Sequence, residues 1–342
     1  MGEREDAIIA RIEAAFGASR DALVGIGDDA AVLNQGRIVV TTDLLIENVD
    51  FTREIPMRFT GSKSLAANVS DLAAMGAVPG SFLMALGIPE DQLDEIDRLI
   101  EGMADAARAW KIELVGGDLS AASALTIAIT AIGSLENGVE PLRRNGAKKG
   151  EAVFVSRPLG AAAAGLHLLA RGWRIDSSGT VTPPADLPGA VGYSQREFAA
   201  AVIRIQVSPE PEHLLGPALA RARLASACID ISDGLSTDLH RLCVASGIGA
   251  EIEWERIPRF PDLEGIGFSL GIDETRAVLH GGEELALLFT SAGTESELSK
   301  KLGRPVYRIG RTSAVPGVKL VRNGKTSDLP RGGFDHFAGS DA

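Results

Sequence analysis

The chain has 342 residues, 45% of them hydrophobic and 23% charged, so it can bury the cores of about two domains. Its 46 acidic and 34 basic residues give a formal net charge of -12, which argues against binding to nucleic acid or to an anionic membrane. The only cysteines, Cys228 and Cys243, lack metal-ligand spacing, so a disulfide scaffold or structural zinc site is not expected. These features predict a soluble cytoplasmic protein.

Helix-period and strand-period segments alternate through the first half of the chain. Residues 1–16 carry charges spaced among apolar residues, which predicts an amphipathic helix and not a signal peptide. The elements that follow are a strand at 38–42, a helix at 60–76, an apolar segment at 82–88, an acidic helix at 90–110 and a strand at 124–132.

A basic, glycine-containing segment at 143–151 predicts a domain boundary, after which the alternation restarts. The later elements are a strand at 152–156, a helix ending at 171, a glycine- and proline-rich loop at 176–193, a helix at 213–225, a strand at 227–231, a helix at 235–246 and a strand at 285–290. The pattern predicts an α/β (interleaved α+β) fold with an N-terminal domain of residues 1–148 and a C-terminal domain of 149–342.

Aspartates beside glycines and strands are the most informative feature of the sequence. They are Asp28 and Asp29 in GIGDDAAV, Asp43 in TTDLL, Asp71 in NVSDLAAMGA, Asp118 in VGGDLS, and Asp230 and Asp233 in IDISDGLSTDL. Glycine permits tight turns, and short carboxylates at such turns would face a shared opening. Crowded carboxylates repel one another unless a cation neutralises them, and Mg²⁺ prefers carboxylates together with substrate phosphates. We therefore expect Mg²⁺ that holds a polyphosphate; the alternative is a set of unrelated turn aspartates.

The residues that hold the phosphates are less strongly marked, because the chain has no Walker A motif. Gly116 and Gly117 offer backbone N–H groups to an anion, and Arg144 offers a bidentate phosphate contact unless it is a solvated loop arginine. The run GAAAAG at 160–165 indicates close helix packing instead.

Three further polar side chains have an ordinary structural interpretation. Lys63 is expected to be an exposed helix lysine, and His280 a hydrogen-bonding structural residue. In GGEELALLF, Glu283 is a candidate for a ligand contact, whereas Glu284 is equally well explained as a surface charge at a strand edge.

Eight segments, taken in order, resemble one family. They are GIGDDAAV, TTDLL, SLAANVSDLAAMGAVP, GGDLS, RRNGAKKGE, IDISDGLSTDL, GGEE and GGFDHF. Together they resemble the aminoimidazole-ribonucleotide-synthetase-like superfamily, over about residues 20–337. VSDLAAMGA, RRNGAK and GFDHF are most similar to the thiamine-monophosphate kinase family within it.

The resemblance implies a two-domain fold whose N-terminal mixed sheet forms a homodimer, and a C-terminal α/β domain that completes the site. It implies phosphorylation of thiamine monophosphate by ATP, with several Mg²⁺ ions and direct in-line transfer that needs positioning more than a nucleophilic side chain. By motif position, the metal ligands are Asp28, Thr41, Thr42, Asp43, Asp71, Asp118, Asp230 and Asp233. The ATP contacts are Gly117, Asp118, Arg144 and Ser232, and the substrate contacts are Asp50, Glu283 and Phe334.

Two segments depart from the kinase pattern, and both lie on the acceptor side. Asp50 replaces a histidine in a V-H-F triplet, and an ionised aspartate repels a substrate phosphate unless another metal ion intervenes. GGEELAL replaces G-G-E-D-Y-E-L and so loses an aromatic residue and an acid. Two alternatives follow: another ATP-dependent activity of the superfamily, such as that of a purine-precursor synthetase, or a nucleotide-binding homologue without turnover.

Overall fold

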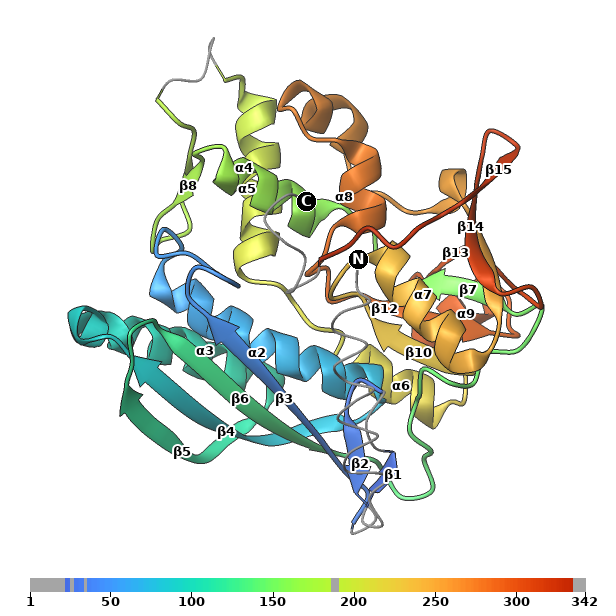
Figure 1. Ribbon diagram of the computed structural model, residues 1–342, viewed down its shortest axis with the longest axis horizontal. Helices are drawn as coiled ribbons and strands as arrows, with labels where there is room; N and C mark the ends of the chain where they lie inside the picture. The colour runs from blue at the N-terminus through green and yellow to red at the C-terminus, as the bar shows by residue number, and fades with distance from the viewer. Residues whose placement is uncertain (1–21, 25–27, 34–35, 186–190, 335–342) are drawn as a thin grey trace.

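The computed structural model describes residues 22–24, 28–33, 36–185 and 191–334. The described chain forms two large β-sheets, one from each half of the sequence, with helix α2 between them (Figure 1). The helix predicted over residues 1–16 lies outside the described residues. Within these ranges, the search for a helix of membrane-spanning length and hydropathy finds none.

The first sheet has six strands in the order β1-β2-β3-β6-β4-β5. It is a mixed sheet, as predicted, because β4 and β5 are parallel whereas β6 runs antiparallel to both β3 and β4. The strands are β1 (Ala22–Val24), β2 (Ala31–Leu33), β3 (Ile38–Ile46), β4 (Val78–Ile88), β5 (Glu113–Ala121) and β6 (Thr126–Ser134).

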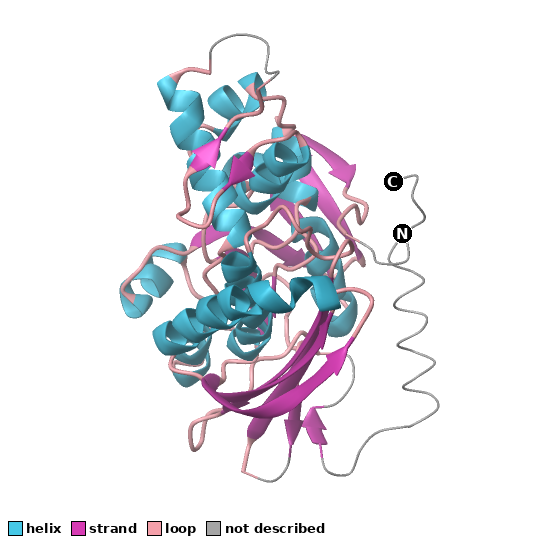
Figure 2. Ribbon diagram, turned by 90° about the vertical axis from the view of Figure 1, so that its left-hand side faces the viewer, coloured by secondary structure: helices cyan, strands magenta, loops and turns pink. Residues whose placement is uncertain are grey.

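Among the described residues, two helices cover one face of this sheet and none covers the other, as Figure 2 shows. These helices are α2 (Met57–Ala74) and α3 (Ile96–Trp110), the latter preceded by a 3₁₀ turn, η1 (Glu90–Glu95). Two glycines allow these helices to approach closely. A Cβ at Gly61 would lie 2.1 Å from Leu99 O, and a Cβ at Gly102 would lie 1.8 Å from Arg58 O. The uncovered face exposes Leu44 and Leu83.

The second sheet has seven strands in the order β10-β12-β7-β13-β11-β14-β15 and is covered on both faces. Helices α4, α5, α7 and α8 pack on one face, and α6 and α9 pack on the other, where Phe154 and Phe289 stack with centroids 5.3 Å apart. The strands are β7 (Ala152–Val155), β10 (Ala227–Asp230), β11 (Gly249–Glu253), β12 (Leu287–Ser291), β13 (Tyr307–Ser313), β14 (Gly317–Arg322) and β15 (Lys325–Asp328).

The remaining elements lie mainly in the second half of the chain. They are α4 (Ala161–Ala170), β8 (Arg174–Ile175), β9 (Val181–Thr182), α5 (Tyr193–Val207), α6 (Leu215–Arg221), α7 (Leu235–Ser246), η2 (Trp254–Arg256), η3 (Leu263–Gly267), α8 (Glu274–His280) and α9 (Glu295–Leu302). Close packing of α4 on α5 confirms the interpretation of GAAAAG, because a Cβ at Gly165 would meet Val202 O at 2.3 Å.

The α/β fold class is confirmed, but several elements differ from the predictions. The segment 176–193 contains the short strand β9, and α5, α8, α9, β5, β11, β13, β14 and β15 were not predicted. The domain boundary between 148 and 149 remains a prediction, although the first sheet ends at residue 134 and the second begins at 152.

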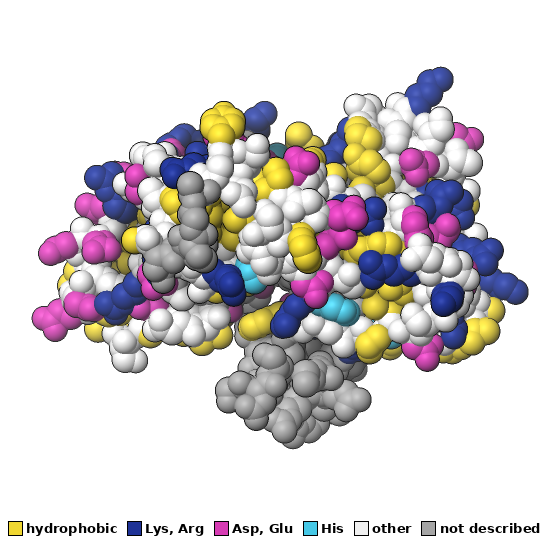
Figure 3. Space-filling model, turned by 90° about the horizontal axis from the view of Figure 1, so that it is seen from above, with side chains coloured by type: hydrophobic (Ala, Val, Ile, Leu, Met, Phe, Trp, Pro, Cys, Tyr) yellow, Lys and Arg dark blue, Asp and Glu magenta, His cyan; other side chains and the backbone are white. Residues whose placement is uncertain are grey.

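Charged side chains of both signs are spread over the face shown in Figure 3. On that face the basic side chains are interspersed with acidic ones and do not form a continuous positive surface.

Candidate functional site

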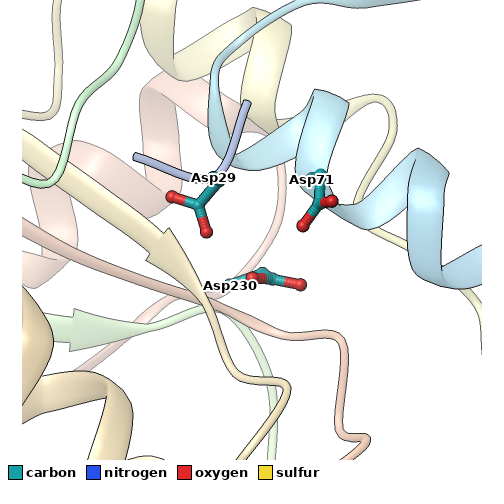
Figure 4. Close-up of side chains that lie close together, drawn as sticks. All are labelled: Asp29, Asp71 and Asp230. Atoms are coloured by element: carbon teal, nitrogen blue, oxygen red, sulfur yellow. The ribbon is translucent and has the colours of Figure 1, made fainter. Parts of the chain in front are cut away.

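Three aspartates from distant parts of the sequence meet at one point, which we call the acidic cluster: Asp29, Asp71 and Asp230 (Figure 4). One carboxylate oxygen from each lies within 4.8 Å of the others. Asp29 precedes β2, Asp71 is on α2, and Asp230 is the last residue of β10. The cluster therefore joins the first sheet, its helix layer and the second sheet.

Hydroxyl groups orient two of these carboxylates. Thr41 Oγ1 on β3 donates a hydrogen bond to Asp71 Oδ2 at 2.6 Å, and Ser70 Oγ donates to Asp230 Oδ2, also at 2.6 Å. Because Ser70 and Asp71 are adjacent in α2, this single turn of helix contributes one carboxylate and orients a second. The cluster therefore depends on the helical conformation of residues 68–74, the last turns of α2.

Arg144 lies against the acidic cluster and is not a solvated loop arginine. Its Nε and Nη2 donate to Asp29 Oδ2 and Oδ1 at 3.1 and 3.0 Å, a bidentate pair in which Asp29 is fully buried. The backbone N–H of Arg144 also donates to Asp28 Oδ1 at 3.1 Å. This arginine neutralises part of the negative charge and presents a guanidinium group beside the cluster.

The remaining carboxylates are buried and crowded, and their burial raises their pKa values more than the neighbouring charges do. Burial raises the pKa of Asp71 well above its usual range, and the charges of Asp43, Asp230 and Asp29 raise it further. Burial and then Asp29 do the same to the pKa of Asp230. Burial raises the pKa of Asp28 and of Asp43 to about 6, with additional effects from Asp29 and Asp50 respectively. One arginine therefore does not neutralise the site, which favours a bound cation.

The donor set fits Mg²⁺. The candidate ligands are hard carboxylate oxygens, as Mg²⁺ prefers, and no cysteine or histidine belongs to the cluster. In addition, Asp43 Oδ2 is buried without a hydrogen-bond partner among the described residues. A buried carboxylate oxygen in this state is costly unless a cation binds nearby.

A second acidic group lies beyond β10 and includes Asp233 in the loop before α7 and Asp238 in the first turn of α7. The buried Asp238 accepts hydrogen bonds from the backbone N–H groups of Asp233 and Gly234 at 3.1 Å and so fixes this loop. Arg241 forms ion pairs with both Asp233 and Asp238. The backbone N–H of Phe334 donates to Asp233 O at 3.1 Å, which places the start of GFDHF beside the same loop.

The GGEE segment contains two glutamates with different environments. Glu283 pairs with Lys63, whose Nζ lies 2.6 Å from Glu283 Oε1. The expectation of an exposed Lys63 is wrong, because only 13% of its side chain is exposed. Glu284 is not a surface charge: it is buried, accepts hydrogen bonds from Gly160 N and Ala162 N at the start of α4, and its burial raises its pKa to about 7.

The interpretation of His280 as a structural residue is confirmed. Its Nδ1 lies 2.8 Å from Ser236 Oγ, and burial lowers its pKa.

Some predicted site residues do not reach the acidic cluster. Gly117 and Asp118 were expected in a turn but lie within the exposed edge strand β5, where a Cβ at Gly117 would meet Met84 O at 1.8 Å. The side chain of Thr42 faces away from Thr41 and donates to Ile129 O at 3.0 Å. Asp50 Oδ2 accepts the backbone N–H of Ile46 at 2.7 Å and so closes the turn after β3.

The predicted aspartates also differ in their local structure. Asp43 lies inside β3 and Asp71 inside α2, so only some of them occupy turns. The metal-ligand set implied by the resemblance named Asp28 and omitted Asp29, which is the member of the pair in the cluster. The doublet in GIGDDAAV is the signal that marks this position, but it does not show which carboxylate points inward.

Comparison with known proteins agrees with this geometry. The family models described as AIR synthase related protein, N-terminal domain and C-terminal domain, match residues 27–135 and 185–323. The thiamine-monophosphate kinase of Rhodopirellula baltica is 32% identical over 329 residues, which cover 92% of this chain and 91% of that protein. The chain belongs to the AIR synthase related family and, within it, to the thiamine-monophosphate kinases.

Solved structures of thiamine-monophosphate kinases share the fold. The structure described as AaThiL complexed with AMPPCP and TMP is 28% identical, with a TM-score of 0.80 and coverage of 97% of both chains. The kinase from Stenotrophomonas maltophilia is 33% identical, with a TM-score of 0.71 and coverage of 94% of this chain and 97% of that one. The fold expected from the sequence motifs is therefore confirmed.

Proposed function

We propose that this chain phosphorylates thiamine monophosphate to thiamine diphosphate, with ATP as the donor and Mg²⁺ as the cofactor. The observation that carries the proposal is the acidic cluster with Arg144 beside it, in a chain whose relatives are named thiamine-monophosphate kinases. The binding of AMPPCP and TMP by the neighbour AaThiL supports both the donor and the acceptor.

In this proposal the residues of the chain bind and orient, and no side chain forms a covalent intermediate. Bound Mg²⁺ neutralises charge on the reacting phosphates, which is the main requirement of in-line phosphoryl transfer. Asp28, Asp43, Asp71 and Asp230, joined by Asp29, hold the ions, and Thr41 keeps Asp71 in orientation. Arg144 contacts the nucleotide phosphates, and Ser232 and Asp233 contact ATP and metal from the loop after β10.

The acceptor binds on the side of Glu283, Phe334 and Asp50. Asp50 accepts the hydrogen bond from Ile46 N and so stabilises the turn after β3. A histidine at this position has no carboxylate with which to accept that bond. Asp50 also lies close enough to Asp43 to raise the pKa of that carboxyl. In our proposal Asp50 lies on the acceptor side next to the metal ligand Asp43, and a bound cation offsets its charge, so the loss of the histidine does not abolish acceptor binding.

The first test is the release of ADP from Mg²⁺–ATP by the purified protein, with and without thiamine monophosphate. We expect stimulated ADP formation, matched mole for mole by thiamine diphosphate that is identified by chromatography. Phosphate-free thiamine is the control acceptor, because the proposed reaction needs an acceptor phosphate. ATP binding without any stimulation by thiamine monophosphate would contradict the proposed acceptor and leave the metal site in place.

We also propose that the protein acts as a homodimer, because of where Asp118 lies. The strand register aligns Asp118 with Ala85, Ala128 and Leu44, so its side chain is on the face opposite Asp43. Three strand spacings, roughly 14 Å, separate it from β3. Within one subunit Asp118 therefore cannot share an ion with Asp71, and the role expected from the resemblance requires a second copy packed on the open face.

Complementation tests this arrangement. Asp71→Asn and Asp118→Asn are each expected to be inactive alone, whereas their mixed dimer, in which one of the two sites is intact, should have about half of the wild-type activity. Product formation by the co-purified subunits, each with a different tag, measures this directly. Full activity of Asp118→Asn alone, or an absence of recovery in verified mixed dimers, would contradict a site shared between subunits.

A further inference from the structure

Glu283 is held by two donors from different helices, an arrangement that we call the Glu283 bridge. Lys63 Nζ from α2 lies 2.6 Å from Glu283 Oε1, and Gln206 Nε2 from α5 donates a hydrogen bond to Glu283 Oε2. Lys63 is 13% exposed as a side chain and Gln206 is 3% exposed as a residue, whereas the side chain of Glu283 is 37% exposed. The carboxylate therefore reaches solvent while both of its donors are largely enclosed.

The backbone of the GGEE segment holds this carboxylate in place. Glu283 and Leu285 both have left-handed backbone conformations, with φ of 62° and 47°, which non-glycine residues adopt only under constraint. The constraint comes from the chain after β10, since Glu283 N donates to Ser232 O at 2.7 Å and Leu285 N donates to Ile231 O at 3.0 Å. A strained backbone of this kind persists where contacts with neighbouring segments hold it, and such backbone is common at binding sites.

The position of Lys63 on α2 shows which end of the acceptor the bridge faces. Lys63 precedes Asp71 by two helical turns, about 12 Å along the axis. Helical side chains lean toward the N-terminus, so the Lys63 side chain extends away from the acidic cluster. The phosphates belong at the cluster, and the bridge therefore lies toward the opposite, organic end of a bound substrate.

Gln206 supplies a second, independent indication of a ligand. Its Nε2 is used by Glu283, but its Oε1 is buried and has no hydrogen-bond partner among the described residues. Buried polar atoms are nearly always paired in folded proteins, and an unpaired carbonyl oxygen is satisfied when a donor binds. Glu283 and Gln206 thus present a carboxylate and a carbonyl oxygen, both acceptors, next to each other.

We infer that Lys63 and Gln206 are positioning residues that hold Glu283 as the acceptor for the amine-bearing, cationic ring end of the substrate. The inference rests on the proposed function, because thiamine phosphates carry a thiazolium cation and an aminopyrimidine amine. Lys63 holds one oxygen of the carboxylate in place through the 2.6 Å ion pair. Gln206 fixes the other carboxylate oxygen and offers its own carbonyl to the same amine.

The test compares ligands with and without the phosphate. For Lys63→Met we expect KM for thiamine monophosphate to rise about tenfold, the usual effect of removing one charge-assisted contact, with kcat and the KM for ATP within about twofold. Calorimetry should show the same loss of affinity for phosphate-free thiamine, since the change is at the ring end. Lys63→Arg should restore most of the affinity, and Gln206→Met should weaken both thiamine ligands in the same way.

Arg58→Met is the matched control, because Arg58 is also a cation on α2 and forms an ion pair with Asp105 away from the bridge. It should leave all of these constants unchanged.

Weaker binding of thiamine monophosphate to Lys63→Met, with unchanged binding of thiamine, would place Lys63 at the phosphate and overturn the inference. If Lys63→Met also lowered Tm and raised the KM for ATP, Lys63 would have a purely structural role, and this result would also overturn the inference. A wild-type protein that binds neither thiamine ligand would overturn the proposed function itself.

Discussion

Asp71→Asn should lower the rate of Mg²⁺-dependent product formation by about a thousandfold or more, because it removes the carboxylate on which the acidic cluster is centred. Asp71 is the group whose pKa is raised by three neighbouring aspartates as well as by burial, so its charge is the one most dependent on a cation. Asparagine keeps the size of the side chain and an oxygen that can accept the Thr41 hydrogen bond. Steady-state kinetics with Mg²⁺–ATP and thiamine monophosphate measure the loss.

The same variant should be no less stable than the wild type when metal is absent. Removing one member of a crowded set of carboxylates relieves repulsion, so we expect the metal-free Tm to be equal or to rise by a few degrees, about 1–2 kcal/mol of stability. Asp97→Asn on the exposed side of α3 is the control and should change neither activity nor Tm. Near-normal turnover of Asp71→Asn would remove Asp71 from the metal site, and a large drop in Tm would assign it a structural role instead.

The stability of the metal-free protein should fall as the pH rises from about 5 to 7.5. Burial raises the pKa of Asp28 and of Asp43 to about 6 in the folded protein, against 3.8 for an ordinary aspartate, so the folded state binds more protons than the unfolded state across this window. Stability then decreases with pH: a shift of about two units at one carboxyl corresponds to about 3 kcal/mol over the whole range from about pH 4 to 7, and about half of this is lost above pH 5. Asp238 and Glu284, each with a pKa of about 7, contribute in the same direction.

Mg²⁺ should reverse this trend, since it binds the ionised cluster and not the protonated one. Thermal unfolding at pH 5 and pH 7.5, with EDTA or with excess Mg²⁺, measures both effects. We expect Mg²⁺ to raise Tm by several degrees at pH 7.5 and by much less at pH 5, with Na⁺ at equal ionic strength as the control. A metal-free Tm that rises with pH, or an equal effect of Mg²⁺ at both pH values, would show that the cluster is not the titrating metal site.

Local periodicity made a large part of the fold predictable. The helix over 60–76 and the strands over 38–42 and 124–132 were identified because apolar residues recur with the period of the element, and this depends only on near neighbours. The elements that escaped prediction, such as β14 and β15, are short and rich in charged residues. The two strands form a local hairpin across Asn323 and Gly324, a turn signal that apolar periodicity alone does not reveal, and β14 also pairs with the distant β11.

The sequence by itself determined the chemical type of the site: aspartates in quantity, few histidines, and the motifs that group this chain with its family. Only the tertiary structure decided which aspartates meet. Strand alternation sends Asp43 and Thr42 to opposite faces of β3, and the backbone before β2 turns Asp29 into the cluster. The structure also paired Lys63 with Glu283 across 220 positions of sequence. Residue identity specifies what a side chain can bind, but which side chains become neighbours depends on packing between distant segments, which local patterns do not encode.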